Sequence, residues 1–161
     1  MIRDYAETDA PDVLALNEAN LPELGPMDQA KLDLLANDSP CFKVVEVDGR
    51  AVGMLIVLDE TSSYPSLNYG WFRARHEVFA YVDRIALGTE ARGAGWGPAL
   101  YEIATTYAVE AGKPVLCAEV NTVPPNPRSH RFHEINGFVV VEHFQPYGGP
   151  ATVAMFEKAL A

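Results

Sequence analysis

The sequence predicts an α+β fold in which helices cover both faces of a mixed central β-sheet. Two observations lead to this expectation. β-rich runs and amphipathic helical segments follow the order β α α β β β α β α β β along the chain. Consecutive strands favour antiparallel pairing in the first half, whereas a strand–helix–strand unit in the second half requires a parallel crossover. The 161 residues, of which 48% are hydrophobic, are enough for one core, so we expect one domain over residues 1–161.

Caps, breaks and alternating apolar residues predict the elements of the N-terminal half. Thr8 and Asp9 offer a helix cap before Pro11, and Asp48-Gly49 is typical of a two-residue hairpin turn. The expected elements are a strand at Ile2–Tyr5, a helix from Pro11, a break at Leu21–Pro26, a helix at Met27–Ala36, and strands at Phe42–Val47 and Ala51–Leu58. The stretch from Asp59 to Arg75 has little periodicity and is expected to be irregular.

The C-terminal half is predicted to contain two helices that alternate with strands. The first helix would bury a face with the i, i+3, i+4, i+7 spacing, formed by Leu100, Ile103, Ala104, Tyr107 and Ala108. Asn126 caps the second helix, with Pro127 at its first position. The expected strands are Phe79–Leu87, Val115–Val120, Phe138–Phe144 and Thr152–Lys158, with a rigid connection at Thr122–Pro125 and a turn at Tyr147–Pro150.

A glycine-rich loop from Arg92 to Gly97 joins a predicted strand to a predicted helix and is the most informative stretch of the chain. Alternate glycines and a helix start leave backbone N–H groups uncovered, which favours binding of a phosphate or pyrophosphate. The loop lacks the Lys-Ser/Thr of a P-loop, because Pro98 and Ala99 follow Gly97, and its glycine spacing is not that of a dinucleotide fingerprint. A turn without a ligand, or a site for another phosphate ligand, stays open.

The pattern Arg-x-x-Gly-x-Gly after a strand resembles the pyrophosphate loop of the GNAT superfamily of acyl-CoA N-acyltransferases. A second stretch matches the family's C-terminal pattern in register, at Asn126, Ser129, Phe132, Gly137 and Phe138. His133 departs from that pattern, because the family usually has a tyrosine there. The resemblance covers roughly Val44 to Phe138, most of the chain.

The resemblance implies the GNAT fold and direct transfer of an acetyl group from acetyl-CoA to a small-molecule or peptide amine in a ternary complex, without a metal. A non-catalytic acyl-CoA sensor of the same fold is the alternative. The cosubstrate would lie in a gap between the strands Phe79–Leu87 and Val115–Val120, with a backbone N–H at Leu87 as oxyanion donor. The cofactor contacts implied in this way are Ile85, Leu87, Arg92, Gly93, Ala94, Gly95, Trp96, Gly97, Asn126, Ser129 and Phe132.

Acyl transfer also needs groups that move protons. His133, at the family's tyrosine position, is a candidate acid for the leaving thiolate, or else only a packing residue. Strand alternation predicts that Tyr81 and Asp83 share a face with Ile85 and Leu87. The same alternation groups Val115, Cys117, Glu119 and Asn121. The catalytic candidates are therefore His133, Asp83, Glu119 and Tyr81, with Asp83 or Glu119 as general base. A water chain without a dedicated base stays open, and Cys117 as a nucleophile is disfavoured because the superfamily transfers directly.

The acceptor side is expected to include Tyr69, Trp71 and Phe72, unless these aromatic residues only cover the core. A net charge of −10 argues against a nucleic-acid partner and favours a cationic or neutral amine. No apolar run is as long as a membrane span, and Met1–Asp4 shows no signal region, so we expect a cytoplasmic protein without a membrane partner. The two cysteines imply no disulfide framework. A homodimer stays open.

Overall fold

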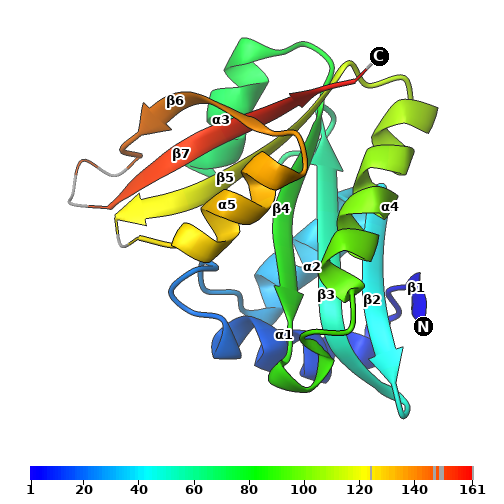
Figure 1. The fold of residues 1–161 in the computed structure, drawn as a ribbon. Helices are drawn as coiled ribbons and strands as arrows, with labels where there is room; N and C mark the ends of the chain where they lie inside the picture. Colours follow the sequence, from blue (N-terminus) through cyan, green and yellow to red (C-terminus); the bar gives the residue numbers. More distant parts are fainter. Residues whose placement is uncertain (124, 147, 149–150, 161) are drawn as a thin grey trace.

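The structure is a computed structural model that describes residues 1–123, 125–146, 148 and 151–160. Within this part of the chain, seven strands form one mixed sheet in the order β1-β2-β3-β4-β5-β7-β6 (Figure 1). Only β4 and β5 pair in parallel. The strands are β1 (Ile2–Asp4), β2 (Cys41–Val47), β3 (Arg50–Asp59), β4 (Ala80–Leu87), β5 (Val115–Val123), β6 (Val139–Phe144) and β7 (Thr152–Ala159). The predicted α+β class is confirmed.

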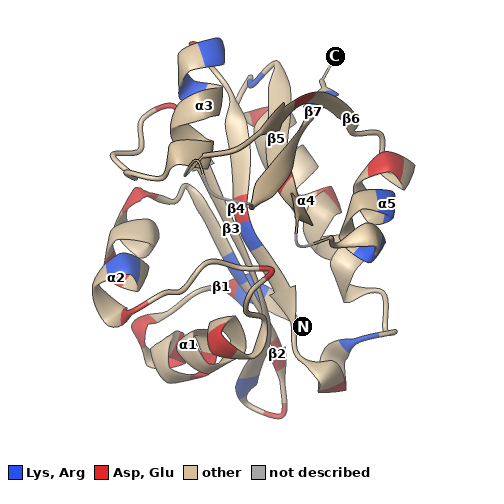
Figure 2. Ribbon diagram, turned by 90° about the vertical axis from the view of Figure 1, so that its left-hand side faces the viewer, with Lys and Arg blue, Asp and Glu red and all other residues tan. Residues whose placement is uncertain are grey.

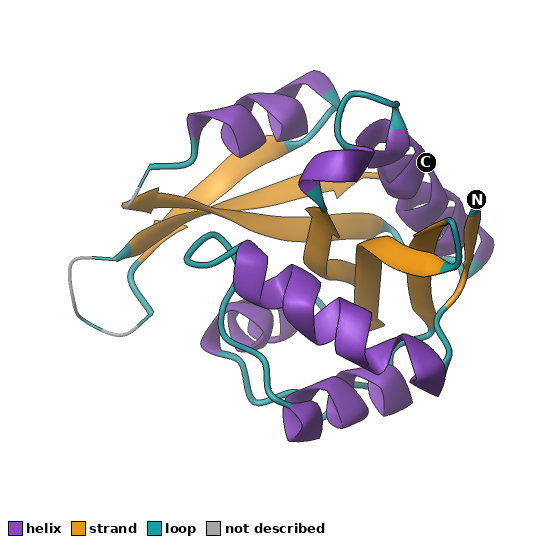
Figure 3. Cartoon of the chain, turned by 90° about the horizontal axis from the view of Figure 1, so that it is seen from below, coloured by secondary structure: helices purple, strands orange, loops and turns teal. Residues whose placement is uncertain are grey.

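Helices lie on both faces of this sheet (Figure 3). One face is covered by α1 (Ala10–Ala19), α2 (Gln29–Asp38) and α3 (Leu67–Arg75), and the other by α4 (Trp96–Glu110) and α5 (Pro127–Ile135). Two short 3₁₀ turns, η1 (Glu7–Asp9) and η2 (Thr89–Ala91), precede α1 and the glycine loop. Each face buries its own apolar cluster, because the central strands are buried on both sides. No described helix is long and apolar enough to cross a membrane.

Two predicted local signals are confirmed in their geometry. Asp48 and Gly49 both have positive φ, 52° and 78°, as a two-residue hairpin turn between β2 and β3 requires. The Asn126 side chain accepts a hydrogen bond from the backbone N–H of Ser129, and Pro127 is the first residue of α5. Of the predicted turn Tyr147–Pro150, the structure describes Gly148 alone, and Pro124 of the predicted connection also lies outside the described residues.

The stretch expected to be irregular contains a helix, so that prediction is wrong for α3. Ser66 caps this helix, because its Oγ accepts a hydrogen bond from the N–H of Tyr69 at 3.3 Å. Tyr69 and Phe72, three residues apart, are buried on its inner face. The helix is nine residues long and has only these two buried positions, which is too short a run for a periodic pattern to appear.

A β-bulge in β4 overturns the predicted alternation of side chains. The β3–β4 register steps from Val57↔Val82 to Ile56↔Arg84, so Asp83 is an extra residue without a partner. Before the bulge, Tyr81 packs in the core beneath α1–α3, but after it Ile85 and Leu87 pack against the cluster beneath α4. The prediction that Tyr81 shares a face with Ile85 and Leu87 is therefore wrong. On β5 the alternation holds, since Val115 and Cys117 both belong to the core beneath α1–α3.

The parallel strands β4 and β5 touch over only two residue pairs. Their register consists of Ala80↔Leu116 and Tyr81↔Cys117, and beyond these pairs the strands diverge (Figure 1). On the far side, β5 pairs with β7 along nearly its whole length. The divergence therefore opens the middle of the sheet at the carboxyl end of β4.

Candidate active site

A cleft of about 1270 Å³ occupies the opening between β4 and β5. Its walls come from β4, β5, the start of α4, the face of α5 and the loop between α1 and α2. The predicted cofactor residues that line it are Ile85, Leu87, Arg92, Gly93, Gly95, Trp96, Gly97, Asn126, Ser129 and Phe132. Ala94 is the one predicted cofactor residue that is not part of the lining. Of the predicted catalytic residues, Asp83, Glu119 and His133 line the cleft and Tyr81 does not.

The backbone of β4 presents unpaired groups to this cleft. Gly88 donates its N–H to the carbonyl of Val52 at 2.7 Å, which makes Leu87↔Gly53 a non-hydrogen-bonded pair of the antiparallel ladder. The N–H and C=O of Leu87, and of Ile85 two residues earlier, therefore point away from β3. They face the side from which β5 has diverged. An extended ligand chain can add to β4 there as a further strand.

The glycine loop forms an anion cradle at one end of the cleft. Gly93 and Gly95 have φ of 81° and 83°, and Gly95 is the N-cap of α4. A Cβ at either position would meet no protein atom within 4 Å, so the left-handed backbone, and not crowding, requires glycine. The helix start supplies free N–H groups and a partial positive charge. These features fit a pyrophosphate.

The helices near the cleft differ in charge, with basic residues on α5 and acidic residues on α1 (Figure 2). On one side, α5 carries Arg128 and Arg131, and Arg128 lines the cleft with Arg92. On the other side, the charged residues of α1 are all acidic. Arg92 and Arg128 thus favour anionic groups at the α4–α5 side of the cleft.

Glu119 lies in the cleft wall without a counterion. Its Oε1 accepts a hydrogen bond from Asn68 Nδ2 at 3.4 Å. Its Oε2, Asn68 Oδ1 and the Tyr81 hydroxyl are buried and have no hydrogen-bond partner among the described residues. Burial, and secondly the charge of Asp83, raises the pKa of Glu119 to about 8, and burial also raises the pKa of Tyr81. Buried polar atoms without partners suit a polar ligand that would complete them.

Asp83 differs from Glu119 because it has a cation beside it. Arg84 is only 4% exposed, and its Nε lies 3.2 Å from Asp83 Oδ2. The same guanidinium donates to Asn17 Oδ1 at 2.7 Å and to the carbonyl of Gly25 at 2.5 Å. Burial raises the pKa of Asp83 to about 6, against the opposing effect of Arg84. Arg84 therefore ties the α1–α2 loop to β4, and Asp83 serves as its charge partner.

His133 is 3% exposed and uses both ring nitrogens within the protein. Its Nδ1 lies 2.7 Å from the carbonyl of Ser129, an acceptor, so Nδ1 carries the hydrogen. Burial lowers the pKa of His133, which favours the neutral ring. Nε2 then accepts the hydroxyl hydrogen of Tyr101. In this arrangement the imidazole has no free N–H for a thiolate.

The predicted acceptor-side aromatic residues are placed differently. Tyr69 and Phe72 are 1% and 0% exposed and belong to the core, so the prediction that they line the acceptor side is wrong. Trp71 packs against Phe72 and Phe144 and is also absent from the cleft lining. The segment forms the helix α3, which the sequence pattern does not predict, and this helix turns the rings inward. From the same segment, Tyr64 and Asn68 line the cleft instead.

Several residues of the cleft lining have no role predicted from the sequence, among them Tyr64, Asn68, Arg84 and Tyr101. The burial of Tyr101 could have been inferred, because this residue directly follows the buried Leu100 in a helix whose start was predicted. The cap Ser66 would have placed Asn68 in the first turn of α3. For Arg84 there was no local signal, since its partners Asn17 and Gly25 are far away in the sequence.

The family model described as "Acetyltransferase (GNAT) family" matches residues 10–138 of this chain. No curated protein sequence matches it. Among solved structures, Ard1 from Thermoplasma volcanium has a TM-score of 0.80 at 21% identity, covering 100% of this chain and 97% of that one. Naa20 from Chaetomium thermophilum, bound to a bisubstrate analogue, has a TM-score of 0.77 at 19% identity, covering 99% of this chain and 86% of that one. The ribosomal-protein-alanine N-acetyltransferase from Brucella melitensis has 0.74 at 23%, covering 99% of both chains.

Proposed function

Since the chain belongs to the acetyltransferase (GNAT) family, we propose that it transfers the acetyl group of acetyl-CoA directly to an amine. One observation carries the proposal. A single cleft holds the anion cradle at Gly93–Gly97, the free backbone groups of Ile85 and Leu87, and the unpaired carboxyl of Glu119. These are the parts needed to bind a diphosphate with an extended arm and to accept a proton near the end of that arm.

The two ends of the cleft have separate tasks. Backbone N–H groups of the loop and the α4 start bind the pyrophosphate, with Arg92 and Arg128 as nearby cations. The β4 backbone at Ile85 and Leu87 aligns the pantetheine arm. Acetyl-CoA supplies an activated acetyl thioester, and the Leu87 N–H donates a hydrogen bond to its carbonyl oxygen as negative charge develops.

Glu119 acts as the general base in this proposal. Its raised pKa lets it take a proton from an ammonium near neutral pH and so expose the nitrogen lone pair for attack on the carbonyl carbon. The C–S bond of the thioester then breaks, and the second proton lost by the nitrogen neutralises the departing CoA thiolate, which leaves as the thiol. Asn68 holds Oε1 of Glu119, which leaves Oε2 for the substrate. Asp83 is the weaker candidate for the general base, because its carboxyl already forms an ion pair with Arg84. Tyr81, the remaining candidate, is fully buried and does not line the cleft, so it is assigned no contact with the amine.

The acceptor is proposed to be a primary amine that arrives as an ammonium ion. An ammonium has three N–H donors, and two residues of the cleft lining, Asn68 and Glu119, offer buried acceptors without partners at Oδ1 and Oε2. The related structures include one named as a ribosomal-protein-alanine N-acetyltransferase and one bound to a bisubstrate analogue. These names support the inclusion of peptide N-termini among the acceptors to be tested.

Binding and turnover test the proposal separately. Acetyl-CoA is expected to raise the melting temperature of the protein, and thiol release is measured with polyamines, peptide N-termini, lysine peptides and amino sugars as acceptors. Glu119→Gln should keep the acetyl-CoA shift and lose at least 100-fold in kcat, the range for loss of a general base. Binding without turnover for any amine would indicate the alternative function, a non-catalytic acyl-CoA sensor. Absence of a shift would contradict both.

A further inference from the structure

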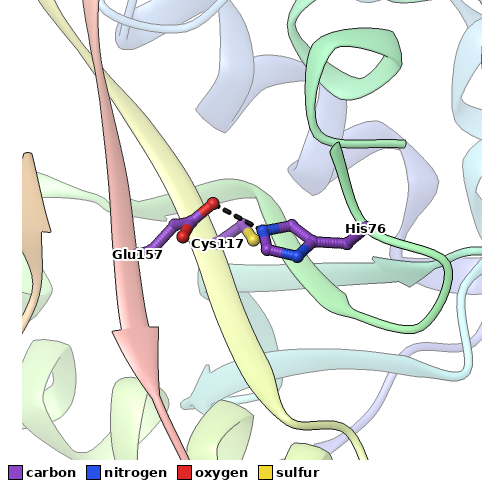
Figure 4. A group of neighbouring side chains, drawn as sticks. All are labelled: His76, Cys117 and Glu157. Carbon is purple, nitrogen blue, oxygen red and sulfur yellow. Dashed lines mark hydrogen bonds and ion pairs between the residues drawn. The ribbon is translucent and has the colours of Figure 1, made fainter. Parts of the chain in front are cut away.

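A second group of reactive side chains lies outside the cleft lining, where α3 ends against β5 and β7 (Figure 4). Cys117 of β5 and Glu157 of β7 are direct partners in the antiparallel register. His76 follows the last residue of α3 and points toward both of them (Figure 4). Three segments far apart in the sequence thus bring an imidazole, a thiol and a carboxyl to one point.

The geometry of this group is compact. One ligand atom from each of His76, Cys117 and Glu157 lies within 4.8 Å of the other two. His76 Nε2 and Glu157 Oε2 are 2.6 Å apart. Two ligands of a tetrahedral zinc ion are roughly 3.3–3.5 Å apart, given metal–ligand bonds of about 2.0–2.3 Å. For His76 and Glu157 alone, an ion would replace their hydrogen bond after the two atoms move apart by less than about 1 Å. His76 can make this shift because its side chain is 23% exposed.

We propose that His76, Cys117 and Glu157 bind a zinc ion, with water as the fourth ligand. The donor set decides the metal, because thiolate and imidazole select Zn²⁺ over Mg²⁺ and Ca²⁺, which take oxygen ligands. Charge also balances, since a thiolate and a carboxylate neutralise a divalent cation. The site is largely shielded from water, with Cys117 fully buried and Glu157 9% exposed.

The positive charge of Arg75 opposes the binding of a cation at this site, because Arg75 pairs with Glu157. Its Nε lies 2.8 Å from Glu157 Oε2, and its side chain is 47% exposed. Carboxylates that bind zinc are commonly held by a second hydrogen bond, which Arg75 supplies. About half of the Arg75 side chain is exposed, so solvent screens its charge. The ion would link the end of α3 to β5 and β7.

Cobalt absorption tests the proposal directly, because Co²⁺ bound to a thiolate gives a charge-transfer band in the near ultraviolet. Untagged protein is stripped with a chelator and titrated with Co²⁺ without added thiols. We expect a band that saturates at one ion per chain and disappears on addition of Zn²⁺. Cys117→Ala should abolish the band. Cys41→Ala is the matched control, because Cys41 is also free and buried but belongs to β2, and it should leave the band unchanged.

A second variant keeps the test valid if Cys117→Ala does not fold. His76→Gln changes a partly exposed residue and should weaken Co²⁺ binding at least tenfold while the circular dichroism spectrum stays that of the wild type. Zn²⁺ should also raise the melting temperature of the wild type and of Cys41→Ala, but not of His76→Gln. Absence of the band in wild-type protein, or its persistence in Cys117→Ala, would overturn the proposal. Neither readout depends on acetyl transfer.

Discussion

The hydroxyl of Tyr101 in α4 hydrogen-bonds Nε2 of His133 in α5, and the two side chains are 4% and 3% exposed. This bond joins the helix that follows the glycine loop to the helix of the second family motif. The Tyr101 ring also packs edge-on against His133 and Phe138. The pair thus fixes one wall of the cleft against the other.

His133→Phe is expected to act mainly on stability. The substitution leaves the Tyr101 hydroxyl without a partner, which should lower the free energy of unfolding by about 1–3 kcal/mol. Urea unfolding measures this loss, and Tyr101→Phe should reproduce part of it. We expect kcat to fall less than tenfold, because the neutral imidazole has no free N–H. A 100-fold fall in kcat with unchanged stability would instead establish His133 as the acid at the thiolate.

Gly95→Ala is expected to weaken acetyl-CoA binding at least tenfold. Alanine at φ 83° is strained, and the loop N–H groups lose their alignment on the pyrophosphate. Gly112→Ala is the matched control, because Gly112 has φ 73° and the same open surroundings but follows the far end of α4. Both variants should lose similar stability, about 1–2 kcal/mol. Equal acetyl-CoA affinities in calorimetry would remove the loop from the binding site.

Glu119 should make activity and stability respond to pH in opposite directions. The rate should rise with pH toward about 8, because the base must be ionised. The folded state holds a proton on Glu119 that the unfolded state, with a pKa near 4.5, releases. The free energy of unfolding of the wild type should therefore decrease as the pH rises from about 4.5 to about 8, by at most about 1.4 kcal/mol per pH unit. Denaturation of Glu119→Gln at several pH values should show a shallower decline; an identical decline would place the titration elsewhere.

Arg84→Gln should loosen the loop between α1 and α2. The variant removes a buried cation from Asp83 and breaks its bonds to Asn17 and Gly25, which should cost about 3–5 kcal/mol. Hydrogen exchange in residues 20–28 should increase, and KM for the amine should rise more than KM for acetyl-CoA. Arg50→Gln, at an exposed ion pair with Asp12, is the control and should change stability by less than about 1 kcal/mol. Equal losses in the two variants would contradict this role of Arg84.

The acceptor preference should follow the charge around the amine site. Cationic amines are expected to have higher kcat/KM than anionic ones of similar size, because the carboxyls of Glu23, Asp83 and Glu119 line the cleft. Raising the salt concentration should reduce the difference. Steady-state rates with matched amines at low and high salt measure it. Efficient acetylation of anionic amines without a salt effect would argue against a cationic acceptor.

The sequence predicted what depends on local signals. The glycine loop, the Asn126 cap and the hairpin at Asp48-Gly49 are each encoded by a few adjacent residues, and their geometry is as expected. The cofactor side of the cleft follows from them. The acceptor side could not be predicted in the same way, because it depends on a nine-residue helix and on one extra residue in β4. The role of Arg84 could not be predicted either, because the side chain pairs with its neighbour Asp83 and also with Asn17, which is far away in the sequence.

The bulge at Asp83 divides β4 into two segments that can change independently. Up to Tyr81 the strand packs in the core beneath α1–α3, and from Ile85 onward its side chains pack beneath α4 and its free backbone groups face the cleft. A substitution on one side of the bulge leaves the pleat on the other side intact. Deletion of Asp83, the residue without a partner, would keep the later side chains on their present faces but would remove the carboxyl that pairs with Arg84. The bulge thus supplies a buried carboxyl at the cleft without disturbing the pairing of the strand segments on either side of it.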